Sequence, residues 1–430
     1  MNILEILNKR GFIENKTHQK ELEDYINQGP AVCYIGFDPT ASSLHVGSLV
    51  PIMALAHFQR CGNQPIALVG GGTGLIGDPS GKTEIRKLLT KEKIKENSAG
   101  LKKQLSKFID FTDDKALLLN NEEWLTDLKY IDFLRDIGRH FSINRMIKAE
   151  SYKSRLDSED GLNFIEFNYM LLQSYDFLKL FESHNCKIQM GGSDQWGNIV
   201  AGIELIRRMR QKNSFGITFP LLVTSNGKKM GKTESGTVWL DASRTSPYQY
   251  YQFWINTDDR DIKRFMALFT FLPMEEIEKI EGCADSQLNE AKAVLAYETT
   301  KIAHGKEEAD KAFFAASGIF GEKIIPKSFF PSSGIPRETK ETSDSLPTSL
   351  IDKKTFQKGL PVFKLFCVAG LTMSGGEAKR LIKQGGAYIN GNRITDIQYI
   401  ATTTDIENNS LLLRAGKKRY HKIIIGPNSG

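Results

Sequence analysis

The sequence predicts an α/β fold built on a mainly parallel sheet, followed by an all-helical segment and a small α+β domain. Short apolar runs alternate with amphipathic helical stretches from about residue 31 to 240, which is typical of consecutive βαβ units. No strand is evident from 246 to 320. Beyond 356, a basic helical stretch precedes two short apolar runs, and Asn390-Gly391 is a hairpin turn signal.

The elements of the α/β region are bounded by recognisable turn signals. Gly29-Pro30 ends a helical N-terminal stretch, and Pro51 fits only in the first turn of a helix that begins near Ser48 and ends at Gly62. We expect strands at 31–35, 65–69, 116–119, 188–190 and 219–223, and further helices at 84–110, 130–141, 164–181 and 199–210.

Changes in composition divide the 430 residues into domains. Residues 326–355 contain four prolines and many Ser, Thr and Lys residues, which predicts a linker. We therefore expect an α/β domain at 1–245, a helical domain at 246–325, a linker at 326–355 and an α+β domain at 356–430.

Composition and charge limit the cellular compartment and the binding partners that we expect for this protein. No apolar run approaches the roughly 20 residues of a membrane-spanning helix, and the first residues lack the basic-then-apolar order of a signal peptide. Five scattered cysteines without a Cys-x-x-Cys pair suit a reducing cytoplasm better than a disulfide framework or a zinc site. Residues 356–430 hold eleven Lys and Arg against four acids, which favours a nucleic-acid partner over a merely solvated surface.

The stretch 34–48 is the best candidate for a nucleotide site. It reads as a strand, a Gly-Phe-Asp-Pro-Thr turn and the start of a helix at His45. Backbone amides, the hydroxyl of Thr40 and an imidazole at a helix N-terminus suit phosphate binding, although a lone histidine is more often structural. Tyr34 and Asp38 flank this point, so a second substrate could lie beside the nucleotide.

The glycine-rich stretch 70–81 admits several interpretations. The range 72–77 matches G-x-G-x-x-G, but Asp78-Pro79 follows where a dinucleotide-binding unit needs a helix to begin. The range 81–83 lacks the preceding glycine that a P-loop requires. We interpret the stretch as backbone that passes close to a ligand, with Asp78 placed to bind an amino group and Lys82 and Arg86 placed to reach phosphates.

Two further stretches place polar residues where ligands could bind. Residues 228–233 form a basic loop, which is either solvated or a mobile clamp for phosphates. Tyr169, Gln173 and Asp176 lie three and four residues apart on an otherwise apolar helix, so they share one face and need polar partners.

Together these features resemble the class I aminoacyl-tRNA synthetases, and specifically the bacterial-type tyrosyl-tRNA synthetase family. The signature motifs HIGH and KMSKS correspond to 45–48 and 229–233. Ser48, Gly231 and Thr233 depart from the family pattern, so His45 alone should supply an imidazole. Further similarity covers 34–40, 70–82, 169–176, 191–198 and 254–260, and the range 360–394 resembles the S4-type RNA-binding fold.

The resemblance implies a Rossmann-like nucleotide-binding domain that activates tyrosine with ATP and transfers it to tRNA. Mg²⁺ would arrive with ATP, and no protein-bound metal or organic cofactor is expected. Tyrosine would be bound by Tyr34, Asp78, Tyr169, Gln173, Asp176 and Gln195. ATP would be bound by Gly36, Asp38, Thr40, His45, Gly47, Gly192, Asp194, Lys229, Met230 and Lys232. Catalytic residues would be Thr40, His45, Lys82, Arg86, Lys229, Lys232 and Thr233.

The family is homodimeric, which implies that tRNA(Tyr) is bound across two copies. Arg207 and Arg208 would guide the acceptor stem. The C-terminal domain would bind tRNA through Lys379, Arg380, Lys383, Lys417, Lys418 and Arg419.

Three other functions remain open from the sequence. A tryptophanyl-tRNA synthetase has a similar core, but Tyr34, Asp176 and the S4-like tail favour tyrosine. A non-catalytic RNA-binding protein on the same fold would not need the lysine loop or the acids Asp78, Asp176 and Asp194. A nicotinamide-dependent oxidoreductase is supported only by the G-x-G-x-x-G match.

Overall fold

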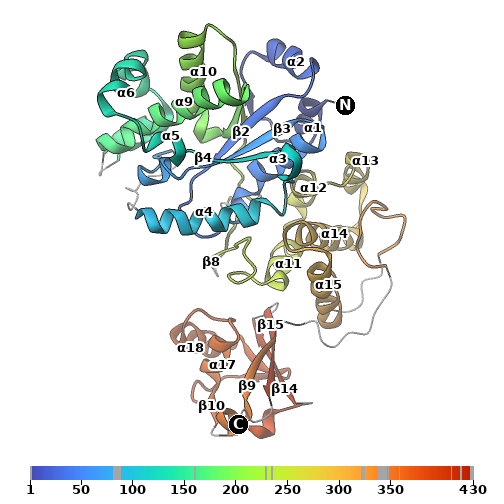
Figure 1. Ribbon diagram of the computed structural model, residues 1–430. Helices are drawn as coiled ribbons and strands as arrows, with labels where there is room; N and C mark the ends of the chain where they lie inside the picture. The colour runs from blue at the N-terminus through green and yellow to red at the C-terminus, as the bar shows by residue number, and fades with distance from the viewer. Residues whose placement is uncertain are drawn as a thin grey trace. The chain divides into compact units, whose positions relative to one another are not determined.

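The computed structural model describes residues 2–80, 89–158, 161–227, 230–233, 236–320, 325–337, 346, 348–357, 359–407, 409–416 and 419–426. The chain divides into two compact units, one of Met1–Arg244 with Asp258–Ala284 and one of Thr245–Thr257 with Asp285–Gly430. Figure 1 labels helices and strands of both units. The stretch 246–325, which we expected to be one helical domain, is thus shared between the units. No helix in these described ranges combines the length and the apolar character needed to cross a membrane.

The first unit is built on a six-stranded sheet in the order β1, β6, β5, β2, β3, β4. Its strands are β1 (Asn15–Lys16), β2 (Val32–Phe37), β3 (Gln64–Val69), β4 (Leu117–Asn120), β5 (Ile188–Gly192) and β6 (Phe215–Phe219). All neighbours are parallel except the short edge strand β1, which confirms the predicted parallel sheet. The last strand, β6, shares only Phe219 with the expected range 219–223 and ends there, because Pro220 has no N–H with which to continue a sheet.

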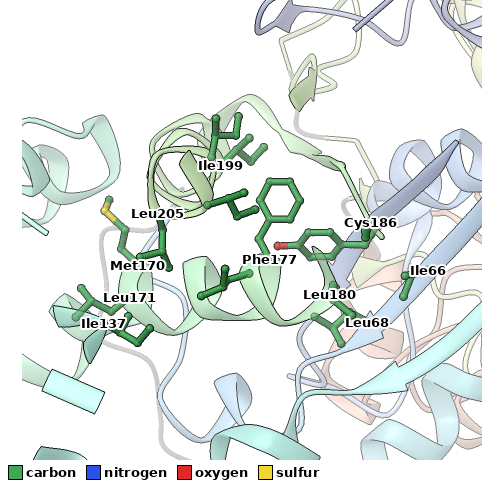
Figure 2. Close-up of a cluster of buried hydrophobic side chains, with 14 of the residues drawn as sticks. Ile66, Leu68, Ile137, Met170, Leu171, Phe177, Leu180, Cys186, Ile199 and Leu205 are labelled. Carbon is green, nitrogen blue, oxygen red and sulfur yellow. The ribbon is translucent and has the colours of Figure 1, made fainter. Parts of the chain in front are cut away.

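The first unit also contains twelve described helices, and the central strands β2, β3, β5 and β6 of its sheet are mostly buried. The helices are α1 (Ile3–Lys9), α2 (Gln19–Asn27), α3 (Leu49–Arg60), α4 (Lys91–Leu105), α5 (Glu122–Leu125), α6 (Tyr130–Asp136), α7 (Ile143–Met146), α8 (Glu150–Leu156), α9 (Phe164–His184), α10 (Trp196–Arg210), α12 (Ile262–Phe269) and α13 (Met274–Ile277). Phe177 of α9, Ile199 of α10 and Leu68 of β3 belong to one buried apolar cluster (Figure 2). Helix α9 begins where the Asn163 side chain accepts a hydrogen bond from the backbone N–H of Glu166.

The sheet separates between β2 and β5, where the strand order reverses. These two strands pair only at Cys33 and Tyr34 of β2. Beyond that point β2 continues along β3 as far as Phe37, and β5 continues along β6 as far as Gly192. Gly36 is consequently exposed although it lies in a central strand. Ligands of open parallel sheets bind at the carboxyl ends of the strands at such a switch point.

The second unit combines a helical part with a second sheet. Its helices are α11 (Pro247–Ile255), α14 (Asp285–His304), α15 (Lys306–Phe320), α16 (Lys353–Gln357), α17 (Val362–Val368) and α18 (Gly375–Lys383). Its sheet has the order β12 (Asn392–Ile394), β11 (Ala387–Ile389), β14 (Ser410–Ala415), β15 (Arg419–Gly426) and β9 (Thr348–Asp352). The strands β10 (Leu360–Pro361) and β13 (Ile400–Ala401) form a separate pair. Buried residues of α17 and α18 pack with alternate residues of β11 and β14.

Part of the stretch predicted to be a linker is ordered secondary structure. Strand β9 lies within 326–355 and pairs in parallel with β15, so the C-terminal sheet begins earlier than we expected. Residues 325–337 are held by hydrogen bonds: Arg337 donates to the carbonyls of Pro326 and Phe330, and Ser333 donates to Glu298 of α14. The Pro, Ser and Thr content concealed these contacts, because none of them follows from local periodicity.

Candidate active site

Asp38 occupies the carboxyl end of β2, at the switch point. Its Oδ1 accepts a hydrogen bond from the Thr73 hydroxyl at 2.8 Å, and its Oδ2 accepts one from the Tyr169 hydroxyl at 2.9 Å. The backbone at Gly70 passes so close that a Cβ there would lie 2.0 Å from Asp38 Oδ1. The glycine-rich stretch therefore lies against the end of β2.

The neighbouring strand β5 ends in the same way. It runs into the short 3₁₀ turn Ser193–Gln195, with Asp194 in its first turn. A Cβ at Gly192 would lie 2.4 Å from Asp194 Oδ1, so the Asp194 carboxylate lies directly against the end of β5. Gly36, Asp38, Gly192 and Asp194, which we predicted to face adenosine, thus end the two strands that border the switch point.

Asp176 is a buried acid on α9 with two side-chain donors. Asn121 Nδ2 donates to its Oδ2 at 2.8 Å, and Trp124 Nε1 donates to its Oδ1 at 2.7 Å. The Asn121 side chain also donates to Thr73 Oγ1 at 3.0 Å, which connects Asp176 to Asp38. Burial raises the pKa of the Asp176 carboxyl to about 7, although both hydrogen bonds act in the opposite direction.

The hydroxyl of Tyr34 is buried beside this acid. Tyr34 is 2% exposed, and its ring lies 5.4 Å from that of Phe177. Burial, together with the nearby charge of Asp176, raises the pKa of the Tyr34 phenol, so the hydroxyl keeps its proton. No hydrogen-bond partner for this hydroxyl is found among the described residues. Burying a hydroxyl without a hydrogen-bond partner costs free energy, unless a bound ligand supplies that partner.

Asp78 belongs to a second polar group near α9. Its Oδ2 accepts from Gln195 Nε2 at 2.7 Å, and its Oδ1 accepts from the backbone N–H of Ser80 at 2.9 Å. Gln173 of α9 donates to Gln195 Oε1 at 3.2 Å and accepts from Asn198 Nδ2 at 2.9 Å. The structure thereby brings together the three residues Asp78, Gln173 and Gln195, which the sequence placed in one site.

The two signature motifs meet although about 180 residues separate them. His45 Nδ1 accepts from the backbone N–H of Gly47 at 3.0 Å, which leaves Nε2 to carry the proton of the neutral imidazole. A Cβ at Gly47 would lie 2.7 Å from His45 Cε1 and 3.2 Å from the carbonyl oxygen of Met230. Gly231 adopts a φ of +80°, and a Cβ there would lie 3.1 Å from the Gly47 nitrogen. Glycines at both positions allow this close packing.

Backbone hydrogen bonds fix the same contact. Val46 N–H donates to the carbonyl of Val238 at 3.0 Å, and Val238 N–H donates to that of Gly231 at 3.0 Å. Residues 230–233 and 236–238 form a small hairpin with β7 (Lys232–Thr233) and β8 (Gly236–Thr237). The start of the first motif and the end of the second are therefore held together by a local sheet-like arrangement.

Several predicted phosphate-binding residues are not fully described. Lys82, Arg86 and Lys229 lie outside the described residues. Lys232 and Thr233 are described only in their backbone, as β7. Thr40 is exposed, and its N–H donates to the carbonyl of Asp38 at 2.8 Å. No group of three His, Cys, Asp or Glu side chains in the described ranges could hold a metal ion.

The predicted tRNA-binding residues belong to both units. Arg207 and Arg208 on α10 both bind the carboxylate of Glu204, each at 2.8 Å or less. Lys379, Arg380 and Lys383 are exposed on α18, and the Lys379 ammonium lies 4.6 Å from the centre of the Phe363 ring. Arg419 donates to the carbonyl of Leu371 at 2.8 Å, whereas Lys417 and Lys418 lie outside the described residues.

The sequence did not reveal the residues that support the predicted site. Asn121, Trp124 and Thr73 hold the acids of the site, and Asn198 and Ser80 complete the group around Asp78. The one available signal was the Asn120-Asn121 pair at the end of β4, because polar residues at the carboxyl ends of parallel strands gather at one edge.

Comparisons with known proteins agree with this geometry. Residues 26–321 match the family model described as tRNA synthetases class I (W and Y). Residues 338–423 match the model described as the Tyrosine--tRNA ligase SYY-like C-terminal domain. The tyrosine–tRNA ligases of Desulfatibacillum aliphaticivorans and Desulfosudis oleivorans are 58% identical over 426 and 429 residues, covering 99% of each chain.

The chain is also similar to solved structures of tyrosyl-tRNA synthetases. A C-terminally truncated mitochondrial tyrosyl-tRNA synthetase of Aspergillus nidulans is 32% identical, with a TM-score of 0.66 over 74% of this chain and 94% of that one. The tyrosyl-tRNA synthetase of Archaeoglobus fulgidus, complexed with L-tyrosine, shares the fold at 19% identity and a TM-score of 0.56, covering 73% of this chain and 100% of that one. The chain therefore belongs to the tyrosine–tRNA ligase family of class I aminoacyl-tRNA synthetases.

Proposed function

We propose that this enzyme joins tyrosine to tRNA(Tyr) in two steps at the site described above. A carboxylate oxygen of tyrosine attacks the α-phosphorus of ATP, the bond to the β-phosphate breaks, and pyrophosphate leaves. A ribose hydroxyl at the tRNA terminus then attacks the carbonyl carbon of the tyrosyl-adenylate, and AMP leaves. No protein group becomes covalently attached, so catalysis rests on positioning and on stabilisation of charge.

The buried Tyr34 hydroxyl beside Asp176 is the observation that carries this proposal. This hydroxyl lies in an apolar cluster next to the Asp176 carboxylate and can still form a hydrogen bond with a ligand. The phenol hydroxyl of a bound tyrosine can donate a hydrogen bond to Asp176 and accept one from the Tyr34 hydroxyl. The phenyl ring of phenylalanine would form neither hydrogen bond, so the site favours tyrosine over phenylalanine.

The second polar group suits the other end of the amino acid. Asp78 is 8% exposed and can compensate a buried ammonium group. Tyr169 and Gln173 project from the same helix as Asp176, which would direct the ammonium to them, while Gln195 would lie beside the carboxylate. Helix α9 would thus set the length of the amino acid that fits between Asp176 and Asp78.

ATP would bind across the switch point. Gly36, Asp38, Gly192 and Asp194 would hold adenosine, and Thr40, His45, Gly47 and Met230 would lie along the phosphates. Lys82, Arg86, Lys229, Lys232 and Thr233 would stabilise the pyrophosphate, with Mg²⁺ entering as part of the nucleotide substrate.

Amino-acid-dependent exchange of pyrophosphate into ATP tests the proposal directly. We expect exchange with tyrosine, exchange with phenylalanine lower by roughly a hundred-fold or more, and none with tryptophan. Exchange with tryptophan instead of tyrosine would identify the sibling specificity. Absence of exchange with every amino acid, together with retained RNA binding, would indicate a non-catalytic RNA-binding protein.

Large exposed apolar side chains of the first unit support a homodimer. Ile131 of α6, Ile143 of α7, Leu156 of α8 and Phe164 of α9 are 71%, 64%, 49% and 67% exposed. Large exposed apolar side chains on neighbouring elements mark association surfaces in soluble proteins. Ile143→Asp should produce a monomer in sedimentation, whereas the exposed control Val368→Asp in α17 should not. A monomeric parent protein would refute the dimer.

The proposal also includes binding of the tRNA by basic residues of both units and a cytoplasmic location. The basic residues on α18 and at the start of β15 would bind the tRNA body, and Arg207 and Arg208 would lie near its acceptor stem. A cytoplasmic location is supported by the odd number and scattered positions of the cysteines.

A further inference from the structure

We propose that the outer face of the C-terminal sheet binds unpaired nucleotides of RNA, at a site separate from the basic helix α18. The site is a row of four side chains, Arg393, Tyr388, Arg414 and Tyr420, which we call the sheet-face row. The inference rests on the proposed tRNA-ligating function only for the identity of the RNA that would bind there.

Strand pairing places these four residues side by side. Tyr388 of β11 lies opposite Arg393 of β12 and opposite Arg414 of β14. Arg414 lies in turn opposite Tyr420 of β15. Residues that face one another across antiparallel strands point to the same side of a sheet, so cations and aromatic rings alternate over four strands.

The row points away from helices α17 and α18 of the same unit. Ala387, Ile389, Leu413 and Ala415, which alternate with Tyr388 and Arg414 along β11 and β14, are buried in the cluster that also contains Ala378 and Ile382 of α18. Successive side chains of a strand alternate between the two faces. Tyr388 and Arg414 therefore face the side opposite to Lys379, Arg380 and Lys383.

Within the row, the arginines contact rings and backbone and carry no acidic partner. The Arg414 guanidinium carbon lies 3.6 Å from the centre of the Tyr388 ring and 6.0 Å from that of Tyr420. Arg393 donates to the carbonyl of Gly385 at 2.8 Å. In the part of the chain that the structure describes, neither arginine pairs with a carboxylate, so both keep their positive charge for a ligand.

This chemistry selects a ligand with planar rings and negative charge. Nucleobases stack on tyrosine rings and on guanidinium planes, and their phosphates bind the charge of the arginines. Stacking of this kind requires bases that are not already paired, because the bases of a duplex cover one another. The excess of seven positive charges in 356–430 also favours RNA over an acidic protein partner.

The full-length protein and a fluorescently labelled single-stranded RNA of about ten nucleotides provide the test. We expect Arg414→Gln and Tyr388→Leu each to weaken binding roughly ten-fold, and Arg414→Lys to weaken it by about three-fold or more because charge remains while the stacking plane is lost. Lys353→Gln, which removes one exposed charge from α16 of the same unit, should change binding by less than about two-fold. A duplex of the same sequence should bind all variants alike.

Controls separate this site from folding and from the proposed ligase activity. Tyr388→Phe keeps the ring and should keep binding, whereas loss of binding by a Tyr388→Phe protein that retains the circular-dichroism spectrum of the parent would refute stacking. Tyrosine-dependent pyrophosphate exchange should be unchanged in every variant. Unaltered RNA binding of Arg414→Gln and Tyr388→Leu, or binding of an acidic phosphopeptide in place of RNA, would overturn the inference. Absence of exchange in the parent protein would refute the proposed function and leave the RNA result to be judged separately.

Discussion

At the scale of single residues, the ionisation of Asp176 should control tyrosine binding. With a pKa of about 7, this carboxyl is partly protonated near neutral pH. The carboxylate form accepts the phenol hydrogen bond, so we expect the KM for tyrosine to rise as pH falls from 8 to 6. Pyrophosphate exchange measured at several tyrosine concentrations across this range gives the profile.

The variant Asp176→Asn supplies the control for this profile. It should raise the KM for tyrosine more than that for ATP and should remove the pH dependence below 8. Because the folded-state pKa lies above the ordinary value of 3.8, ionisation of Asp176 also lowers folding stability as pH rises between 3.8 and about 7. Binding and stability should therefore change in opposite directions with pH. A pH profile that is the same in the parent and the variant would exclude Asp176 as the titrating group.

Gly47 should be required for the contact between the two signature motifs. An alanine there would place its Cβ against the His45 ring and the Met230 carbonyl, so the imidazole or the 230–233 segment must move. We expect Gly47→Ala to lower kcat for tyrosine activation about ten-fold or more, with little change in the KM for tyrosine. Gly282→Ala, where a Cβ would meet nothing within 4 Å, is the matched control. Unchanged kcat in Gly47→Ala would show that the motif contact is dispensable.

Some residues of the candidate site could be predicted from the sequence, and others could not. The spacing of Tyr169, Gln173 and Asp176 predicted one helical face, and the structure places all three in hydrogen-bonded groups there. Asn121 and Trp124 escaped prediction because their contact with Asp176 depends on the register between β4 and its neighbour, which no local pattern encodes.

At the scale of elements, the loop that carries the second signature motif is anchored by Asp261. This acid is 3% exposed, and its Oδ2 accepts from the backbone N–H and hydroxyl of Ser225 at 2.8 and 2.9 Å. Arg264 donates to its Oδ1 at 2.6 Å and to the carbonyl of Val223. In Asp261→Asn, an amide NH₂ group replaces the oxygen that accepts from Ser225, so the loop should lose the two hydrogen bonds that hold it at Ser225. We expect a several-fold higher KM for ATP with an unchanged KM for tyrosine.

Steady-state exchange kinetics measure both constants for this loop. The exposed neighbour Asp259 offers a control, since Asp259→Asn should leave both values within about two-fold. Equal increases in the two KM values would argue for a general folding defect instead of a loop effect.

The buried ion pair between α8 and α9 should stabilise the first unit. Arg155 Nη2 lies 3.0 Å from Glu166 Oε2, and the two side chains are 0% and 3% exposed. Glu166→Ala would leave a buried guanidinium without its carboxylate, which should lower the free energy of unfolding by roughly 3–5 kcal/mol. Urea unfolding followed by tryptophan fluorescence measures the change. Glu182→Ala, which removes a partly exposed partner of Arg210, should cost about 1 kcal/mol or less.

Elements were predictable where their periodicity was strong. The long helix α9 and the central strands β2 and β3 lie within a few residues of their expected positions. Strand β9 was not expected because its five residues lie among Ser, Thr and Pro, and its partner β15 is about 70 residues away. Pairing between such distant segments is decided by the tertiary fold, and composition alone does not reveal it.

At the scale of the whole molecule, β9 determines where the chain can be divided. The strand belongs to the C-terminal sheet, so deleting 356–430 would leave its backbone groups without β15 and would uncover Ile351, which is buried in the intact protein. A truncation after Arg337 keeps the hydrogen bonds of that side chain to residues 326–330 and removes the sheet completely. We expect the 1–337 protein to retain tyrosine-dependent pyrophosphate exchange and to lose tRNA charging. The 1–355 protein should aggregate more readily in light scattering, whereas loss of exchange in a folded 1–337 protein would contradict a modular division of activation and tRNA binding.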